Sequence, residues 1–362
     1  MSRLLFYVSG HGFGHATRIA ALTVALRGRA RTPLEIHVRS EAPEWLLRER
    51  NPELRYSSAP LDVGMLQPNG LDLELERTLA AHEAFVRDFD SAVEREARFI
   101  RALAPDLVVS DVPALAFPSA RRAETPGVAI ANFSWDWILD FYAAAEPRFG
   151  AIAAHYREAY GQAQRLFRLP LHGDLSAFSA RVDTPLLVNR SSSTPAEARA
   201  ALGLPEADPR KLVLCSFGGF GSSPFVAADG EDLSAYAFIG MGAAPTGFPG
   251  DWLALERPFP VAHEDLIQAC DAVLGKTGYS TVAEVLAHGK RMLYLSRPDF
   301  AEAVVIEAEL EALGCARALP RDDFEAGRWC AHLDALFTET SPAPIPPANG
   351  AEFIADALLA SL

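Results

Sequence analysis

The sequence is short of positive charge, and this shortage excludes a large class of partners. Its 362 residues include 33 Lys and Arg against 47 Asp and Glu, which gives a formal net charge of −14. A nucleic-acid partner would favour clustered cations along its phosphates. We therefore expect no nucleic-acid partner and predict a small or neutral ligand.

Cysteines and long apolar runs are scarce as well. The four cysteines, Cys215, Cys270, Cys315 and Cys330, stand far apart without a CxxC pair, so we expect neither a zinc site nor a disulfide framework. No apolar run reaches the roughly 18 residues of a membrane span, and the N-terminus lacks the pattern of a signal peptide. These absences predict a soluble, cytoplasmic protein with no membrane span.

What the chain does contain is an alternation of strand-like and helical segments. Residues 15–28 and 280–290 repeat apolar side chains at helical spacing, the second from a hydroxyl cap to Gly289. Continuous apolar runs, typical of parallel strands buried on both faces, fill the other segments. This alternation predicts an α/β protein. The predicted strands are 4–9, 34–40, 106–111, 127–134, 211–219, 235–240, 272–278 and 291–297.

The alternation pauses between about residues 140 and 210, where a polar, proline-containing stretch places a domain boundary. We predict two Rossmann-like, doubly wound domains, 1–185 and 186–345, that face a central cleft. A proline-rich linker precedes a last helix over 351–362, which is free to pack back onto the first domain. Ligands bind at the carboxyl ends of such sheets.

The stretch "GHGFGHATR" at residues 10–18 follows the first strand and admits several interpretations. A dinucleotide fingerprint would need glycine at His15 and an acid near Arg39. A metal site would need a third ligand beside His11 and His15. A structural turn, with His15 capping the next helix, stays open. We favour catalysis, because glycines let the backbone approach a ligand while His15 acts as a general base.

An acid behind His15 would strengthen this interpretation. Asp111 ends the strand "DLVVSD", and in a parallel sheet it lies at the same edge as the turn after the first strand. Its carboxylate would orient the imidazole and stabilise its protonated form. The alternative role of Asp111 is the N-cap of the next helix.

The second half carries glycine turns that suit an anion. Gly218 and Gly219 follow a strand and could form a phosphate nest, although such turns are common. The helix that begins near Ser280 would stabilise a diphosphate leaving group. Within it, Thr281 and Glu284 form a possible capping box. We favour the alternative, in which Glu284 accepts hydrogen bonds from ribose.

These motifs carry a resemblance. The second half resembles the donor domain of GT-B glycosyltransferases, such as the peptidoglycan lipid-intermediate N-acetylglucosaminyltransferase and the plant UDP-dependent enzymes. The segments "YVSGHGFGHATR", "DLVVSDV", "NFSWDWI", "FRLP" and "LGKTGYSTVAE" together are similar to the N-terminal glycosyltransferase-like domain of plant L-arabinokinases. The sugar kinase domain of those proteins does not follow after Leu362, so we expect no kinase activity.

The resemblance implies the roles of individual residues. It places His15 as the base and Asp111 as its partner. In the donor loop of those enzymes, a Gln is usual where this chain has "RPDFAEAV", so the sugar contacts Asp299 and Glu302 imply altered chemistry. The implied donor residues are Gly218, Gly219, Phe220, Phe259, Val261, Gly278, Tyr279, Ser280, Thr281, Glu284, Asp299 and Glu302.

The acceptor would lie on the first domain. Trp135 and Asp136 form an aromatic and acidic cluster that suits a sugar-like acceptor, although an ordinary amphipathic cluster has the same pattern. The turn residues His11, Gly12, Phe13 and Gly14 are placed on the same side.

We expect no metal and no cofactor beyond the nucleotide sugar. The DxD pattern at Asp88 and Asp90 lies within a long helical segment and is typical of a solvated face. The predicted activity is inverting, metal-independent transfer of a sugar from a nucleotide-diphosphate sugar, a UDP-sugar, to a hydroxyl acceptor. A nucleotide-sugar epimerase and a non-catalytic sugar-nucleotide-binding protein are the alternatives.

Overall fold

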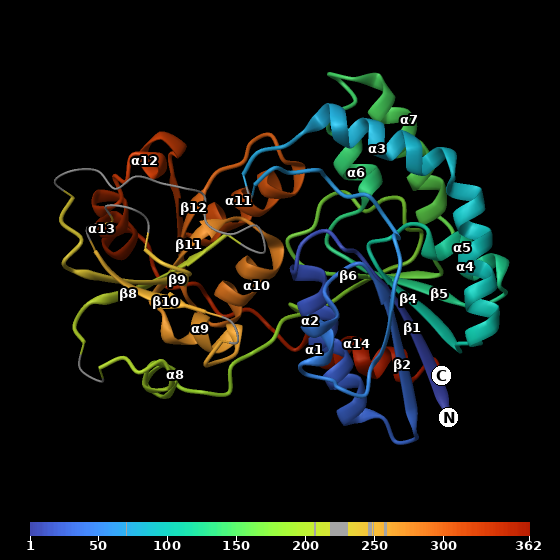
Figure 1. Cartoon of the computed structure of the whole chain (residues 1–362), viewed down its shortest axis with the longest axis horizontal. Coiled ribbons are helices and arrows are strands. Elements are labelled where there is room, and N and C mark those ends of the chain that lie inside the picture. Colours follow the sequence, from blue (N-terminus) through green and yellow to red (C-terminus); the bar gives the residue numbers. More distant parts are fainter. Residues whose placement is uncertain (70, 206–207, 218–230, 245–247, 249, 257–258) are drawn as a thin grey trace.

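The computed structural model describes the whole chain except residues 70, 206–207, 218–230, 245–247, 249 and 257–258. Its described part contains two parallel sheets, each covered by helices on both faces (Figure 1). No described helix is both long and apolar enough to cross a lipid bilayer.

The first sheet has seven strands in the order β3-β2-β1-β4-β5-β6-β7. Its central strands are continuous apolar runs because both faces are buried: Leu4 and Phe6 of β1 face one core, and Leu5 and Tyr7 the other. The strands are β1 (Ser2–Val8), β2 (Leu34–Ser40), β3 (Arg55–Ser58), β4 (Leu107–Asp111), β5 (Gly127–Ala131), β6 (Arg165–Arg168) and β7 (Arg181–Asp183).

Helices cover the two faces of this sheet in separate groups. On one face lie α1 (Gly14–Arg29), α2 (Glu44–Arg48) and α14 (Gly350–Leu359). On the other lie α3 (Leu75–Arg87), α4 (Phe89–Leu103), α5 (Ala116–Arg122), α6 (Trp135–Asp140) and α7 (Pro147–Tyr160).

The second sheet has six strands in the order β10-β9-β8-β11-β12-β13. They are β8 (Lys211–Ser216), β9 (Tyr236–Met241), β10 (Asp251–Leu255), β11 (Ala272–Lys276), β12 (Arg291–Leu295) and β13 (Ala316–Leu319). One face packs against α8 (Pro195–Ala201), α9 (His263–Ala269), α10 (Tyr279–Ala287) and α11 (Ala301–Leu313). The other packs against α12 (Arg321–Glu325) and α13 (Cys330–Glu339).

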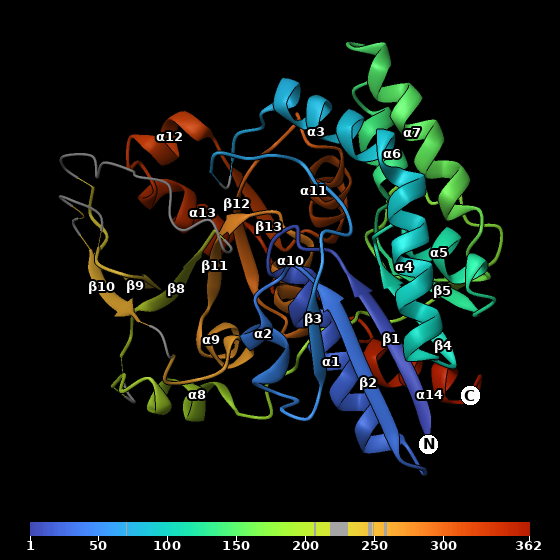
Figure 2. The same cartoon turned by 45° about the vertical axis from the view of Figure 1, so that its right-hand side comes forward.

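The last helix lies on the first sheet rather than beside its sequence neighbours (Figures 1 and 2). The Gly350 amide donates to the Leu186 carbonyl at 3.0 Å, so the two segments that join the halves run together. Arg29 of α1 pairs with Asp356 of α14 at 2.9 Å. The C-terminal segment therefore completes the core of the first half.

Two features differ from the sequence prediction. The region in which the alternation was expected to pause contains α7, β6 and β7. The long helix expected around Asp88 is divided, since α3 ends and α4 begins there. Asp88 and Asp90 are exposed, which confirms that this DxD pattern lies on a solvated face.

Candidate active site

The topology brings His15 and Asp111 together. β1 and β4 are neighbouring parallel strands, and Val8 stands opposite Asp111 at their carboxyl ends. The chain proceeds from β1 toward β2 on one side and returns with β4 on the other, so this point is a topological switch, where such sheets form ligand crevices.

The turn after β1 presents His15 to Asp111. Gly12 has φ of +80°, a value that favours glycine, and α1 begins two residues later. His15 is 7% exposed, and its Nδ1 lies 3.0 Å from Oδ1 of Asp111. Nη2 of Arg18 also lies 3.0 Å from this Nδ1. In the tautomer that donates from Nδ1 to the carboxylate, Nε2 keeps a lone pair.

Two structural alternatives for these residues are wrong. The N-cap of α1 is Phe13, and the His15 side chain bonds to Asp111 instead of capping the helix. The helix that follows β4 has Leu115 as its N-cap, four residues beyond Asp111. Both side chains are therefore available to each other.

Arg18 is a member of this cluster that the sequence analysis missed. Its Nε donates to Oδ2 of Asp111 at 2.6 Å, its Nη2 donates to Oδ1, and its Nη1 donates to Oδ1 of Asn132 at 2.9 Å. Burial would raise the pKa of Asp111, but Arg18 and His15 hold it below its usual range. The i, i+3 spacing of His15 and Arg18 on one helix was the available signal.

A second group of side chains lies beside His15 and consists of Asp62, Trp135 and His11. Trp135 Nε1 donates to Oδ2 of Asp62 at 2.9 Å, and the His11 ring meets the Trp135 ring edge-on at 5.4 Å. Burial raises the pKa of Asp62. Burial and the nearby His15 lower the pKa of His11 to about 3, so His11 is neutral. Sequence analysis missed Asp62, which lies between recognisable elements.

Two other residues placed on the acceptor side point elsewhere. Asp136 pairs with Arg157 of α7, with 3.3 Å between Oδ2 and Nε. Phe13 packs edge-on against Trp45 of α2, with 6.0 Å between ring centroids.

The first turn of α10 faces the first turn of α1. A Cβ on Gly14 would lie 2.6 Å from Oγ of Ser280, so glycine permits this approach. The Arg18 guanidinium lies over the Tyr279 ring at 5.2 Å. The N-termini of one helix from each half thus meet beside His15.

The capping box, the alternative role of Thr281 and Glu284, is not formed in α10. The N-cap is Gly278, which has no side chain, and Thr281 lies within the helix. Glu284 is buried, and its Oε2 accepts from Nδ1 of His263 at 2.8 Å. His263, which the sequence analysis missed, connects α9 to α10.

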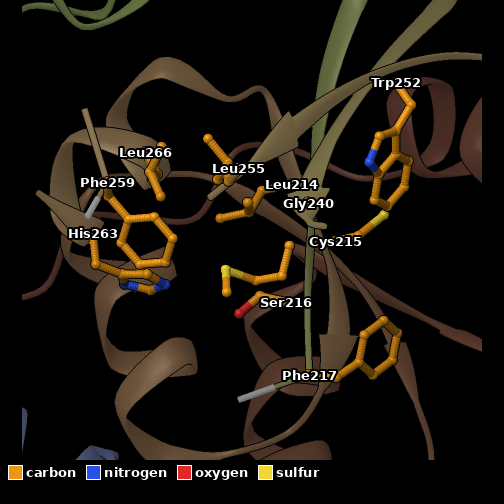
Figure 3. A pocket seen from close by; sticks show the side chains of 11 residues that line it. Leu214, Cys215, Ser216, Phe217, Gly240, Trp252, Leu255, Phe259, His263 and Leu266 are labelled. Carbon is orange, nitrogen blue, oxygen red and sulfur yellow. The ribbon is translucent and has the colours of Figure 1, made fainter. Parts of the chain in front are cut away.

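A pocket lies at the carboxyl ends of β8 and β9. Phe259 and His263 lie next to each other on one side, with Ser216 and Cys215 across from them (Figure 3). Val261 packs against the core nearby. The expected phosphate-loop residues Gly218, Gly219 and Phe220 lie outside the described residues.

The loop after β12 and the start of α11 approach the first half. Oε1 of Glu302 accepts from the Asn132 amide at 2.7 Å, so Glu302 joins the network of Arg18 across the two halves. The Asp299 side chain is exposed, while its carbonyl accepts from the Tyr142 hydroxyl at 2.7 Å. Within the described part of the chain, no group of three or more His, Cys, Asp or Glu is arranged to hold a metal ion.

Comparison with known proteins supports the expected resemblance. No family model matches the sequence. The chain is 30% identical over 334 residues to an L-arabinokinase of Arabidopsis thaliana, which covers 91% of this chain and 31% of that protein. It therefore spans about a third of the length of this relative.

Solved structures show the fold. The glycosyltransferase of kitacinnamycin has a TM-score of 0.63 at 16% identity, and the match covers 100% of this chain and 99% of that chain. Arabidopsis thaliana UGT89C1 in complex with quercetin has a TM-score of 0.62 at 15% identity, with 99% and 98% covered. MurG of Acinetobacter baumannii has a TM-score of 0.56 at 14% identity, with 100% of both chains covered. The protein has the GT-B fold, as the sequence predicted.

Proposed function

We propose that the protein is an inverting, metal-independent glycosyltransferase that moves a sugar from a nucleoside-diphosphate sugar, a UDP-sugar, to a hydroxyl acceptor. The observation that carries this proposal is the position of His15, oriented by Asp111 at 3.0 Å and directly opposite the N-terminus of α10. A base and an anion-stabilising helix end then face the same space.

In the proposed reaction, Nε2 of His15 takes the proton of the acceptor hydroxyl as its oxygen attacks the anomeric carbon. The bond from that carbon to the diphosphate breaks, and the electron pair leaves with the phosphate oxygen. Attack opposite to the leaving group inverts the anomeric centre. The protonated imidazole is stabilised by Asp111, which Arg18 keeps ionised.

The donor would lie along the carboxyl edge of the second sheet. Backbone amides at the start of α10 would stabilise the departing diphosphate. The pocket of Phe259 and His263 would take the base, and Glu284, fixed by His263, would accept from the ribose. His11 and Trp135 would contact the acceptor.

A panel of UDP-sugars, incubated with the protein with and without acceptor extract, tests this proposal through the release of UDP. Acceptor-dependent release that persists with EDTA supports a metal-independent transferase. Conversion of the donor without acceptor would identify an epimerase. Binding without any turnover would identify a sugar-nucleotide-binding protein. Either of the last two results contradicts the proposal.

A further inference from the structure

Arg297 is a buried cation that the proposed reaction does not use. It follows β12 and is 6% exposed, and its guanidinium lies over the Phe300 ring at 4.6 Å. Among the described residues, neither Nε nor Nη2 has a hydrogen-bond partner. Leaving such donors unpaired is costly, so their arrangement points to a ligand that accepts from them.

The two unpartnered nitrogens define the shape of that ligand. Nε and Nη2 lie on the same edge of the guanidinium, so their N–H bonds run parallel. This edge matches the two oxygens of one carboxylate. Arg18 uses the same edge to hold the carboxylate of Asp111 within this protein.

The surrounding charges favour a ligand with a single negative charge. Lys276 ends β11, and burial together with Arg297 lowers the pKa of Lys276 to about 8. Three carboxylates, those of Asp299, Glu302 and Glu307, oppose Arg297, and Oε1 of Glu302 also accepts from the Asn132 amide. Because these carboxylates already offset much of the positive charge of Arg297 and Lys276, the site suits a ligand with a single negative charge better than a diphosphate.

The strand order places Arg297 at the sugar end of the donor. The pocket proposed for the base lies at the ends of β8 and β9, and Arg297 follows β12. In the sheet, β11, which α10 follows, lies between β8 and β12 (Figure 2). Adjacent strands are about 4.8 Å apart, so the end of β12 lies roughly 10 Å from that of β8. A diphosphate at α10 fills the interval, and the sugar reaches Arg297.

We propose that Arg297, assisted by Lys276, binds a carboxylate on the transferred sugar, so that the donor is a nucleoside-diphosphate uronic acid. This inference rests on the proposed function, because it assumes that the nucleotide lies along the second sheet.

Calorimetric titration with UDP, UDP-glucose and UDP-glucuronate tests the inference on the full chain. The wild-type protein is expected to bind UDP-glucuronate about 10- to 100-fold more tightly than UDP-glucose, the range for a bidentate charged contact. Arg297→Gln should abolish this preference and leave UDP affinity unchanged. Arg297→Lys keeps the positive charge but lacks the two parallel N–H groups, so it should retain part of this preference.

Arg317→Gln, on the neighbouring β13 and paired with Glu339, is the matched control and should behave like the wild type. The melting temperature of Arg297→Gln should not fall, because the change removes two buried N–H donors that have no hydrogen-bond partner among the described residues. Equal wild-type affinities for the two sugars, or a loss of UDP binding itself in Arg297→Gln, would overturn the inference alone. A wild type that binds none of the three compounds overturns the proposed function as well.

Discussion

At the scale of single residues, Asp111 serves two partners at once. Arg18 occupies both of its oxygens, and His15 shares Oδ1. The arginine stabilises the ionised carboxylate in a fully buried position, where a lone charge would be costly. The orientation of the proposed base therefore depends on a residue that need not touch the substrate.

His15→Ala is expected to cut sugar transfer by about 100- to 10,000-fold, the range for losing a general base, while UDP affinity stays nearly unchanged. The reason is that the proposed nucleotide contacts lie on the second half. Steady-state kinetics and UDP titration measure the two effects.

His11→Ala is the control on the same turn. His11 contacts Trp135 rather than Asp111, so this change should raise the acceptor KM more than it lowers kcat. Transfer at the wild-type rate in His15→Ala, or loss of its nucleotide binding, would show that the turn has another role.

Because Arg18 and His15 share the Asp111 carboxylate, we predict that single and double variants of this cluster lose different amounts of unfolding free energy. Asp111→Asn leaves the Arg18 charge buried without its counterion and should lower the unfolding free energy by about 3 to 5 kcal/mol. The double variant Arg18→Met/Asp111→Asn should recover much of that loss, because both charges are gone. Denaturant unfolding of the single and double variants checks this, and strictly additive losses would contradict the coupling.

Glu284 supplies a further test at this scale. Because Glu284 forms no capping box in α10, Glu284→Ala should not lower the stability of the first turn of this helix. It should reduce UDP affinity by about 1 to 3 kcal/mol, the range for hydrogen bonds to a charged group. His263→Ala should have a smaller effect, because it removes one side chain from the proposed base pocket but keeps the Glu284 carboxylate. Unchanged UDP binding with a lower melting temperature would indicate a structural role.

At the scale of elements, α3 is held by a neutral histidine. His82 is fully buried between the Tyr156 hydroxyl of α7, at 2.8 Å, and the Gly64 carbonyl, at 3.0 Å. A carbonyl only accepts, so Nε2 carries the proton and Nδ1 accepts from the hydroxyl. Burial lowers the pKa of His82 from 6.5 to about 4.

Acid should therefore destabilise this part of the fold. Below pH 6.5 the unfolded chain binds a proton at His82 that the folded chain resists until about pH 4, so the unfolding free energy falls across that window. The difference corresponds to roughly 3 kcal/mol. Denaturant unfolding between pH 7 and pH 4 should show the loss, and His82→Gln should reduce its slope. An unchanged slope in this variant would mean that His82 is not held neutral.

The sequence predicted those elements whose apolar residues form a recognisable pattern along the chain. β1, β4 and β12 are apolar runs buried on both faces, whereas the edge strand β3 is the half-exposed "RYSS" and carries no such pattern. In the site, His15 and Asp111 follow from strand order alone. Asp62 lies in a connecting segment and His263 is the first residue of α9. Their positions beside the site depend on tertiary packing, and no local signal places them.

At the scale of the whole molecule, the two halves touch through polar contacts around the candidate site. Arg50 pairs with Glu264 at 2.5 Å, Arg321 pairs with Asp72 at 2.6 Å, and Asn132 donates to Glu302 at 2.7 Å. The partly exposed ion pairs contribute little by themselves, whereas the buried Asn132–Glu302 bond connects the start of α11 to Arg18. The contact between the halves and the orientation of the proposed base are thus parts of one network.

The last helix makes the stability of the first half depend on the end of the chain. Ile354 is fully buried between α14 and the core that α1 shares, while Phe353, its neighbour on the same helix, is 39% exposed. Ile354→Ala should lower the unfolding free energy by about 2 to 5 kcal/mol, and Phe353→Ala by much less. In hydrogen exchange, the loss of protection should appear in β1 and α1, which carry the His15 turn, before β8 and α10. Loss confined to the second sheet would show that α14 stabilises its sequence neighbours instead.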